Sequence, residues 1–381
     1  MGFSSMDDFL TETTVNGKFY RSDWNKLTHG TTAQVAGNWH ILSQTAGTPA
    51  ASSLLGTGTN LTLQPGWHDV TPGAGGILHG GDVAPDTKHA VNASAFSAAV
   101  TTMPAIFLLC DVLAHVPITT VTTTGNQTIT SSVTFTADNT TDIITHTGYD
   151  IPTFSRVRLT TTGTLPAGTA LATDYWTIRQ SATTSKLAAS LANAVAGTAV
   201  DMTTNGTGTH TLTALLPRYG DGRGVQALLT PSTVMGAGAP TATMTYTNTA
   251  GTSGRTTPSS PTLPTLNTTS PVAQISYSGT GAGKYGPFIP LASGDQGIQS
   301  AQGINFSATM TSGVQNLMLV RPLFSLPMTT LGVPAERDLM NQIPSLPRIY
   351  DGACLTWLHY AGAATPINSG FYGHLDFAWG S

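Results

Sequence analysis

Threonine alternates with other residues along several stretches of this chain, and the alternation limits the folds that the chain can adopt. Over 241–249 every second residue is threonine, and Met244 and Tyr246 are among the residues between them. A period of two places successive side chains on opposite faces of a strand, and β-branched residues favour strands. The same pattern occurs over 129–136 and 156–160. We therefore expect an all-β protein whose sheets expose threonine where other proteins expose charge.

The distribution of charged and apolar residues excludes two classes of protein. Only 9% of the residues are charged, whereas an ordinary soluble domain has about 25%. The 15 basic and 19 acidic residues form no basic run, so we expect no nucleic-acid partner. The best apolar run, Ala105 to Val116, is too short to span a membrane as a helix and contains Asp111. We therefore expect no membrane partner.

The N-terminus and the cysteines indicate where the chain is made. Residues 1–8 contain neither the basic nor the apolar segment of a secretory signal. Cys110 and Cys354 both lie in apolar strings, which predicts two buried free thiols and excludes a disulfide framework. We expect synthesis in a reducing cytoplasm.

Changes in composition predict one domain inserted into another. Threonine dominates from about 119 to 213, and beyond 213 the composition again resembles that of the first 118 residues. We expect a host domain made of 1–118 and 214–381, with a small β domain, 119–213, inserted into it. Many short strands separated by Gly, Pro and Ser favour a β-sandwich or jelly-roll-like host. Host strands are expected within 37–42, 93–116, 241–249, 273–277, 304–311, 317–322, 354–360 and 372–379.

Two short helices are expected in this β-rich chain. Residues 1–15 form an N-terminal arm, in which a serine at position 4 or 5 can cap a short helix and two aspartates suit its first turn. Residues 333–343 form the second helix. Pro334 fits its first turn, and Leu339 and Met340 supply an apolar stripe.

Two motifs that resemble ligand sites are incomplete. Gly279–Tyr285 resembles a phosphate-binding loop, but it lacks the first glycine and the Ser/Thr that binds magnesium. His68–Asp69 and His79–Asp82 could together form a His/Asp metal site, but no tight ligand pair such as HxH is present. We expect the ten histidines to lie in loops and on the surface.

The remaining chemistry-bearing residues also form no recognisable constellation. No GxSxG elbow is present, and glutamate occurs only at Glu12 and Glu336. Asp221–Gly224 is typical of a hairpin turn, and an ion-binding loop is the alternative. The six tryptophans are expected in a core or a subunit interface unless several share one face. We therefore expect no enzyme activity and no catalytic, cofactor-binding or metal-binding residues.

The predicted insert resembles a small β module that recurs in virion proteins of tailed bacteriophages. The resemblance rests on a Gly-Thr hairpin, an aromatic-rich strand, a T-x-K-L strand and a closing Gly-Thr-Gly-Thr-His strand. These elements are Gly163–Thr169, Tyr175–Ile178, Thr184–Ala188 and Gly206–Thr211.

The host segments resemble phage structural proteins that are encoded near capsid genes. The resembling strings are Leu216–Ala227, Ala335–Asn341, Leu346–Leu355 and Phe371–Gly380. The resemblance supplies no catalytic residues. A major capsid protein of the common tailed-phage type resembles the chain less, because that family has a long spine helix and a charged extended loop.

The resemblance implies a non-enzymatic virion structural protein. The first expectation is a capsid decoration or cement protein on the virion surface. Its partners would be the major capsid protein and copies of itself in a symmetric oligomer such as a trimer, because uncharged sheets lose little on desolvation. The alternative is a tail, collar or fibre protein that binds host-surface glycans.

Overall fold

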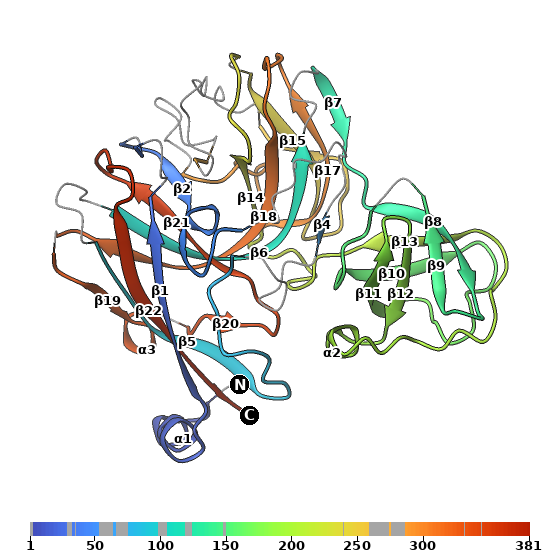
Figure 1. Ribbon diagram of the computed structural model, residues 1–381, viewed down its shortest axis with the longest axis horizontal. Coiled ribbons are helices and arrows are strands. Elements are labelled where there is room, and N and C mark those ends of the chain that lie inside the picture. The colour runs from blue at the N-terminus through green and yellow to red at the C-terminus, as the bar shows by residue number, and fades with distance from the viewer. Residues whose placement is uncertain are drawn as a thin grey trace.

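The computed structural model describes most of the chain. The described residues are 3–28, 33–34, 36–52, 64–65, 75–97, 105–118, 124–147, 150–238, 240–258, 274–275, 286–330, 332–343 and 345–381. The protein is nearly all β, with 48% of the described residues in strands and 7% in helices. The expected fold class is therefore confirmed: a sandwich-like host carries a small closed barrel (Figure 1).

One sheet of the host contains both ends of the chain. Its order is β19-β5-β22-β1-β3, and β20 pairs with the outer side of β5. The strands are β1 (Phe19–Leu27), β3 (Gly47–Thr48), β5 (Thr87–Ser97), β19 (Ala335–Asp338), β20 (Arg348–Ile349) and β22 (Gly370–Gly380). Strand β1 pairs along its whole length with β22, so the first and last strands of the chain lie side by side.

The second sheet lies in the middle of the host and has the order β14-β18-β6-β21-β2, with β4 also pairing β6. Its strands are β2 (Trp39–Ile41), β4 (Gln64–Pro65), β6 (Ala105–Ile118), β14 (Gln226–Pro231), β18 (Gln315–Met328) and β21 (Leu355–Ala361). The expected buried strand at 105–116 is β6, and almost all of its residues are buried.

The third sheet has the order β16-β15-β17-β7. Its strands are β7 (Gly125–Thr128), β15 (Ala242–Asn248), β16 (Arg255–Thr256) and β17 (Ile298–Phe306). Along β15 buried residues alternate with half-buried threonines, as the period of two predicts. Met244 and Tyr246 point into the core, while Thr245 lies on the other face.

Two hydrophobic cores hold the three host sheets together, and the long strands β6 and β18 contribute to both. Phe107 of β6 packs with Trp24 and Trp357 in the core shared with the first sheet. Val116 of the same strand lies in the core shared with the third sheet. The β6–β18 ladder shifts register at two points, and such bulges bend a strand. The bends allow one strand pair to pass between two sandwiches.

The inserted domain is a closed six-stranded barrel with the order β10-β11-β12-β9-β8-β13. Its strands are β8 (Ser132–Asp138), β9 (Ile143–His146), β10 (Arg156–Thr161), β11 (Asp174–Ser181), β12 (Thr184–Ala188) and β13 (His210–Ala214), and it carries the short helix α2 (Leu191–Val195). Closure leaves no free strand edge. Strand β7 pairs with β17 of the host, so residues 125–128, which the sequence analysis assigns to the insert, lie in a host sheet.

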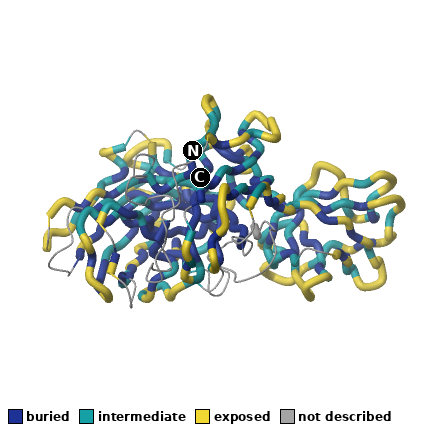
Figure 2. The backbone as a smooth tube through the Cα atoms, turned by 90° about the horizontal axis from the view of Figure 1, so that it is seen from above, coloured by how far each residue is buried: buried dark blue, intermediate teal, exposed yellow. Residues whose placement is uncertain are grey.

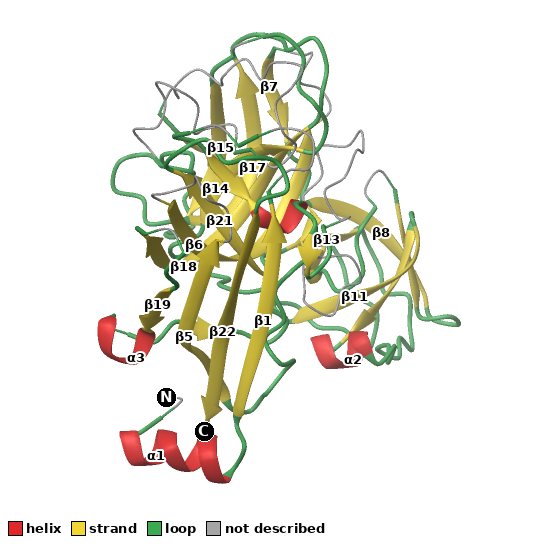
Figure 3. Ribbon diagram, turned by 60° about the vertical axis from the view of Figure 1, so that its left-hand side comes forward, coloured by secondary structure: helices red, strands yellow, loops and turns green. Residues whose placement is uncertain are grey.

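The barrel projects from one side of the host, and each body has its own buried interior (Figure 2). The N-terminal arm lies at the end of the host where the chain termini meet (Figure 3). The arm begins with α1 (Met6–Leu10), capped by Ser5, and continues as a π-helix over Thr11–Val15. The expected helix within 1–15 is therefore present.

The second expected helix is only partly correct. Residues Ala335–Asp338 form strand β19 against β5, and helix α3 covers only Leu339–Gln342. The edge of β5 supplies backbone partners that a helix would not use. Asp338 is the N-cap of α3, because its carboxylate accepts the Met340 N–H at 2.9 Å.

The other sequence-based strand predictions differ from the structure mainly at their ends. The strand expected at 304–311 begins and ends nearer the N-terminus, at Ile298–Phe306, and that expected at 317–322 extends over Gln315–Met328. The stretch 129–136 is divided between an isolated bridge and β8. Most of 273–277 lies outside the described residues.

Candidate functional site

A cleft of about 860 Å³ lies where the barrel meets the host. Strands β5, β18 and β20 and the segment after β13 form the host side, and β10, β11 and α2 contribute from the barrel. Six of the 15 basic residues of the chain line it. They are Lys88, Arg156, Arg218, Arg223, Arg321 and Arg348. A chain with so little charge thus concentrates its cations in one place.

Two similar segments of the sequence converge on this cleft. Leu216–Gly222 reads LPRYGDG and Leu346–Gly352 reads LPRIYDG. Each segment contributes its proline, arginine, tyrosine and aspartate to the lining. The first connects the barrel back to the host, and the second contains β20.

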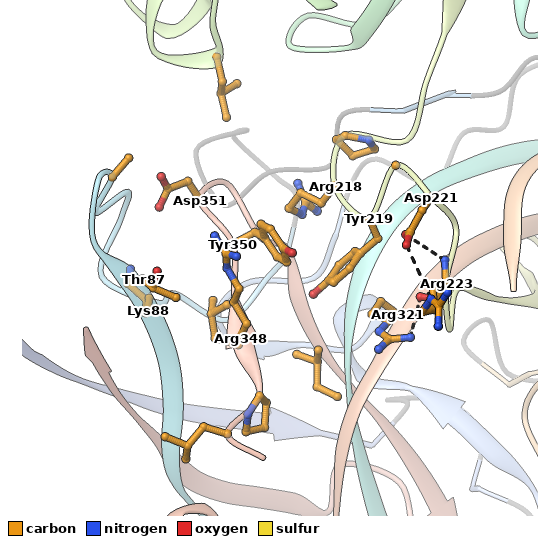
Figure 4. Close-up of a pocket in the computed structure, with 18 of the residues that line it drawn as sticks. Thr87, Lys88, Arg218, Tyr219, Asp221, Arg223, Arg321, Arg348, Tyr350 and Asp351 are labelled. Carbon is orange, nitrogen blue, oxygen red and sulfur yellow. Dashed lines mark hydrogen bonds and ion pairs between the residues drawn. The ribbon is translucent and has the colours of Figure 1, made fainter. Parts of the chain in front are cut away.

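Two tyrosines from these segments form the centre of the cleft, with an arginine beside each (Figure 4). The rings of Tyr219 and Tyr350 meet edge to face with their centroids 4.9 Å apart. The guanidinium of Arg321 lies 5.5 Å from the centroid of Tyr219, and that of Arg348 lies 4.3 Å from the centroid of Tyr350. Stacking on a ring face holds a guanidinium in place while leaving its N–H edge available.

The cations of the cleft differ in whether a carboxylate neutralises them. Arg218 forms a buried bidentate pair with Asp111, at 2.7 and 2.8 Å. Arg156 pairs with Asp174. Arg321 and Arg348, in contrast, form no ion pair with any described residue. Arg321 instead donates to the Arg223 carbonyl oxygen at 2.7 Å.

The three aspartates that line the cleft form no ion pair with Arg321 or Arg348. Asp86 pairs with Lys18 at 2.9 Å. Asp351 accepts the Val83 N–H at 3.0 Å, and Asp221 turns back to its own loop, where it accepts the Arg223 N–H at 3.1 Å. The cleft therefore retains positive charge.

The backbone around Tyr219 is fixed in unusual geometry. Tyr219 has φ of +51°, a conformation that costs a non-glycine residue roughly 1–2 kcal/mol. Gly224 has φ of +68°, in the region that favours glycine, and a Cβ added there would meet the Arg321 guanidinium. Burial, and secondarily the charge of Asp111, raises the pKa of the Tyr219 hydroxyl. The ring therefore adds no negative charge to the cleft.

A Ser–His–Asp cluster lies on the first host sheet, away from this cleft. The Ser94 Oγ lies 2.7 Å from His374 Nδ1, and His374 Nε2 lies 3.7 Å from Asp376 Oδ2. Arg21 holds both oxygens of Asp376 at 2.7 Å. The three residues sit within paired strands β5 and β22, and the His374 backbone N–H donates to Ser94 Oγ at 3.2 Å.

The histidines correct one expectation from the sequence. The sequence analysis places them in loops and on the surface, but several are buried in strands. These are His40, His115, His146, His210 and His359, and His79 is buried in a loop. Burial lowers the pKa of His115 to about 3 and lowers that of His359 well below its usual range. His115 and His359 are therefore uncharged at neutral pH, which allows them to pack in a core.

The other sequence candidates have varied outcomes. Cys110 and Cys354 are buried and free, as predicted. His68, Asp69 and the loop Gly279–Tyr285 lie outside the described residues. Among the residues that the structure describes, no group of three or more His, Cys, Asp or Glu side chains is placed to hold a metal.

The tryptophans do not form a shared platform in the described structure. Trp24 and Trp357 are buried in a host core, and Trp176 lines the cleft. Trp67 lies outside the described residues. The turn at Asp221–Gly224, for which the sequence favoured a hairpin, lines the cleft instead of joining two paired strands.

Comparisons with known proteins add little. No protein-family model matches the sequence, and no curated protein matches it. Two solved structures of infectious bursal disease virus are weakly similar. The Gt strain structure shares 10% identity over 95% of this chain and 80% of that chain, with a TM-score of 0.15. The VP2 subviral particle shares 11% identity over 99% and 83%, with a TM-score of 0.16. TM-scores this low support no conclusion about the fold or function of this chain.

In the described residues, no helix has the length and apolarity needed to cross a membrane.

The sequence analysis missed the cleft, although the sequence held a signal for it. The LPR…DG string occurs twice, 130 residues apart, and identical residues occupy five of its seven positions. Both segments place a tyrosine within two residues of an arginine, in a chain with only 9% charged residues. This repetition could have identified both segments as parts of a candidate site. That they meet depends on long-range pairing, which no local pattern predicts.

Proposed function

We propose that this chain is a non-enzymatic phage virion structural protein, and specifically a capsid decoration or cement protein. The proposal rests on the exposed apolar side chains of the N-terminal arm. The arm and the start of β1 lie at the end of the host that also holds the C-terminus (Figure 3). Four of their large apolar side chains are exposed. They are Met6, Leu10, Val15 and Phe19, between 42% and 77% exposed.

The arm is anchored at its base, so its apolar side chains are presented in a defined position. Lys18 forms ion pairs with Glu12 and Asp86, both at 2.9 Å. Phe3 packs edge to face on Phe9 at 5.0 Å between ring centroids. Exposed apolar side chains in a fixed arrangement mark a protein-binding surface. We assign this surface to the major capsid protein, and the projecting barrel to the outside of the shell.

Mechanistically, such a protein would stabilise a shell by binding only the assembled state. Binding across the seams between capsomers shifts the equilibrium toward intact particles by mass action. Copies arranged as a symmetric oligomer, such as a trimer, would match the symmetry of the shell. The low charge favours this arrangement because few charged groups would lose water at the contacts.

The test is occupancy on particles after the arm is changed. Met6→Ser with Leu10→Ser removes the apolar surface from an exposed segment, so the β core should fold as before. We expect occupancy on purified particles to fall at least tenfold. The matched control is Leu171→Ser with Val195→Ser, which removes exposed apolar side chains from the barrel. Unchanged occupancy of the arm variant would contradict the proposal.

A tail, collar or fibre protein that binds host-surface glycans is the second candidate. The arginine- and tyrosine-lined cleft favours it, because shell binding through the arm gives that cleft no role. The number of copies per particle separates the two candidates.

A further inference from the structure

We propose that the cleft between the barrel and the host is a binding site for an acidic oligosaccharide, whose sugar carboxylates contact Arg321 and Arg348. This inference goes beyond shell binding and does not depend on it, because the exposed arm side chains are not among the residues that line the cleft.

The charge of the cleft defines the first requirement of the ligand. Arg321 and Arg348 are the two guanidinium groups of the lining that form neither an ion pair nor a carboxylate hydrogen bond with a described residue. Each lies against a tyrosine ring, and the two rings touch. Two cations without carboxylate partners line one cleft, so an anion that pairs with them is favoured. Guanidinium forks bind planar carboxylates with two parallel hydrogen bonds.

The aromatic lining defines the second requirement. Tyr219 and Tyr350 occupy the centre of the cleft, and Trp176 contributes from the barrel. Aromatic faces bury apolar area while their polar atoms stay hydrated. A sugar ring has an apolar C–H face and polar edges, so it can pack on a tyrosine while its carboxylate reaches an arginine. A simple inorganic anion would use only the arginines.

The rim is rigid, which favours binding without rearrangement. Four prolines line the cleft: Pro85, Pro217, Pro322 and Pro347. Proline fixes the backbone angle φ and removes conformational freedom before binding. The volume of about 860 Å³ falls within the range of roughly 300–1,000 Å³ that small-molecule sites span. A short oligosaccharide segment therefore fits the site.

The strand pairing argues against an extended acidic peptide as the ligand. A peptide in β-conformation gains affinity from an unpaired strand edge. Lys88 of β5 is paired on both sides, with Trp379 and with Ile349. Strands β10 and β11 belong to the closed barrel. At β18 the residue after Arg321 is Pro322, which has no N–H to donate. Strand β20 pairs only with β5 among the described residues, but it spans only Arg348–Ile349 and offers a peptide little backbone to pair with. Recognition should therefore come mainly from side chains.

The experiment measures binding to the full chain by isothermal titration calorimetry. The probes are a galacturonic acid trisaccharide, its neutral galactose counterpart, hexaglutamate and inorganic phosphate. We expect the galacturonate trisaccharide to bind and the neutral trisaccharide to bind at least tenfold more weakly. Arg321→Gln and Arg348→Gln should each weaken galacturonate binding about tenfold, because each removes a charge-assisted pair.

Three further variants make the test specific. Arg348→Lys keeps the charge but loses the planar fork, so its affinity should fall between wild type and Arg348→Gln. Tyr350→Ala should also weaken binding. Arg179→Gln is the matched control, because this exposed arginine pairs with Asp150 on the barrel and does not line the cleft. Thermal unfolding of each variant should match wild type.

Several results would overturn the inference. Wild-type protein that binds no galacturonate at millimolar concentration would exclude the site. Binding that Arg321→Gln and Arg348→Gln leave unchanged would place it elsewhere. If hexaglutamate bound as tightly as the galacturonate trisaccharide, with the same dependence on these arginines, the cleft would be a peptide site. If inorganic phosphate bound as tightly as the trisaccharide, the cleft would be an unspecific anion site. Particle occupancy of Arg348→Gln should equal that of wild type, so failure here leaves shell binding separately testable.

Discussion

The host core between β5 and β6 is rich in aromatic side chains, whereas the barrel core is mostly aliphatic. Trp24, Phe107 and Trp357 pack together in the host, while Val157, Leu159 and neighbouring aliphatic residues fill the barrel. The two bodies also differ in buried charge. The host buries Lys26, Lys88, Asp111, Arg218 and Asp376, and no Lys, Arg, Asp or Glu is buried among the described barrel residues.

This difference follows from the size and closure of the two bodies. Six strands that close on themselves pair their own backbones and fill a small interior with apolar side chains. The host has three sheets, open edges and long connections, whose carbonyl groups need partners. Lys26 shows the result: its Nζ donates to the Pro49 carbonyl at 2.6 Å, and burial lowers its pKa to about 8. Host stability should therefore depend more strongly on pH and on buried charge than barrel stability, whose ion pairs, such as Arg156–Asp174, are not buried.

Acid should destabilise the host by more than any single substitution described below. The pKa of His115 is about 3 in the folded state, against about 6.5 when unfolded. The folded state keeps this imidazole neutral, so its contribution is complete above pH 6.5 and is lost as the pH falls from 6.5 toward 3. The full loss is about 5 kcal/mol, at 1.36 kcal/mol per pKa unit. Amide hydrogen exchange, corrected for intrinsic rates, should show β6 and β21 losing protection between pH 7 and 3 before β10 and β13.

His115→Gln provides the control for the acid effect. It removes the titratable ring, so the loss of host protection between pH 7 and 3 should become smaller. Barrel strands that lose protection at the same pH as host strands would contradict the comparison.

Breaking the buried ion pair should have the next largest effect. Arg218→Met leaves Asp111 buried without its charge partner, which should lower the free energy of unfolding by about 4 kcal/mol. The double variant Arg218→Met with Asp111→Leu removes both charges, so its stability should be close to that of wild type. Arg179→Met breaks an exposed pair and should cost less than about 1 kcal/mol. Urea unfolding measures all three. Equal losses of unfolding free energy for Arg218→Met and Arg179→Met would contradict the claim that the host depends on a buried ion pair.

A cavity in the barrel should have a smaller effect that stays local. Leu212→Ala removes a fully buried side chain from the barrel core and should cost about 3 kcal/mol. Hydrogen exchange should increase in β10 and β13 but not in β1 or β22, because the barrel core shares no residue with the host cores. Leu171→Ala, at an exposed site of the barrel, should change hydrogen exchange in neither the barrel nor the host. Loss of protection in both bodies would show that they unfold as one unit.

The sequence predicted local structure well where the pattern itself determines it. The alternation of threonine predicted β15, the apolar string predicted β6, and the serine and aspartates predicted α1. The errors came from pairing between distant segments. Residues 335–338 became a strand because the edge of β5 was available, and 125–128 joined β17 in the host. The cleft depends on the same kind of contact, since Tyr219 and Tyr350 meet only in the folded chain.

The most direct test of the proposed function is the number of copies of this chain per particle. Quantitative mass spectrometry of purified virions whose genome encodes the chain measures it. A capsid decoration protein predicts on the order of hundreds of copies, in a multiple set by the symmetry of the shell. About a dozen copies or fewer would place the chain in the tail, collar or fibre, and absence from the particles would contradict the virion proposal.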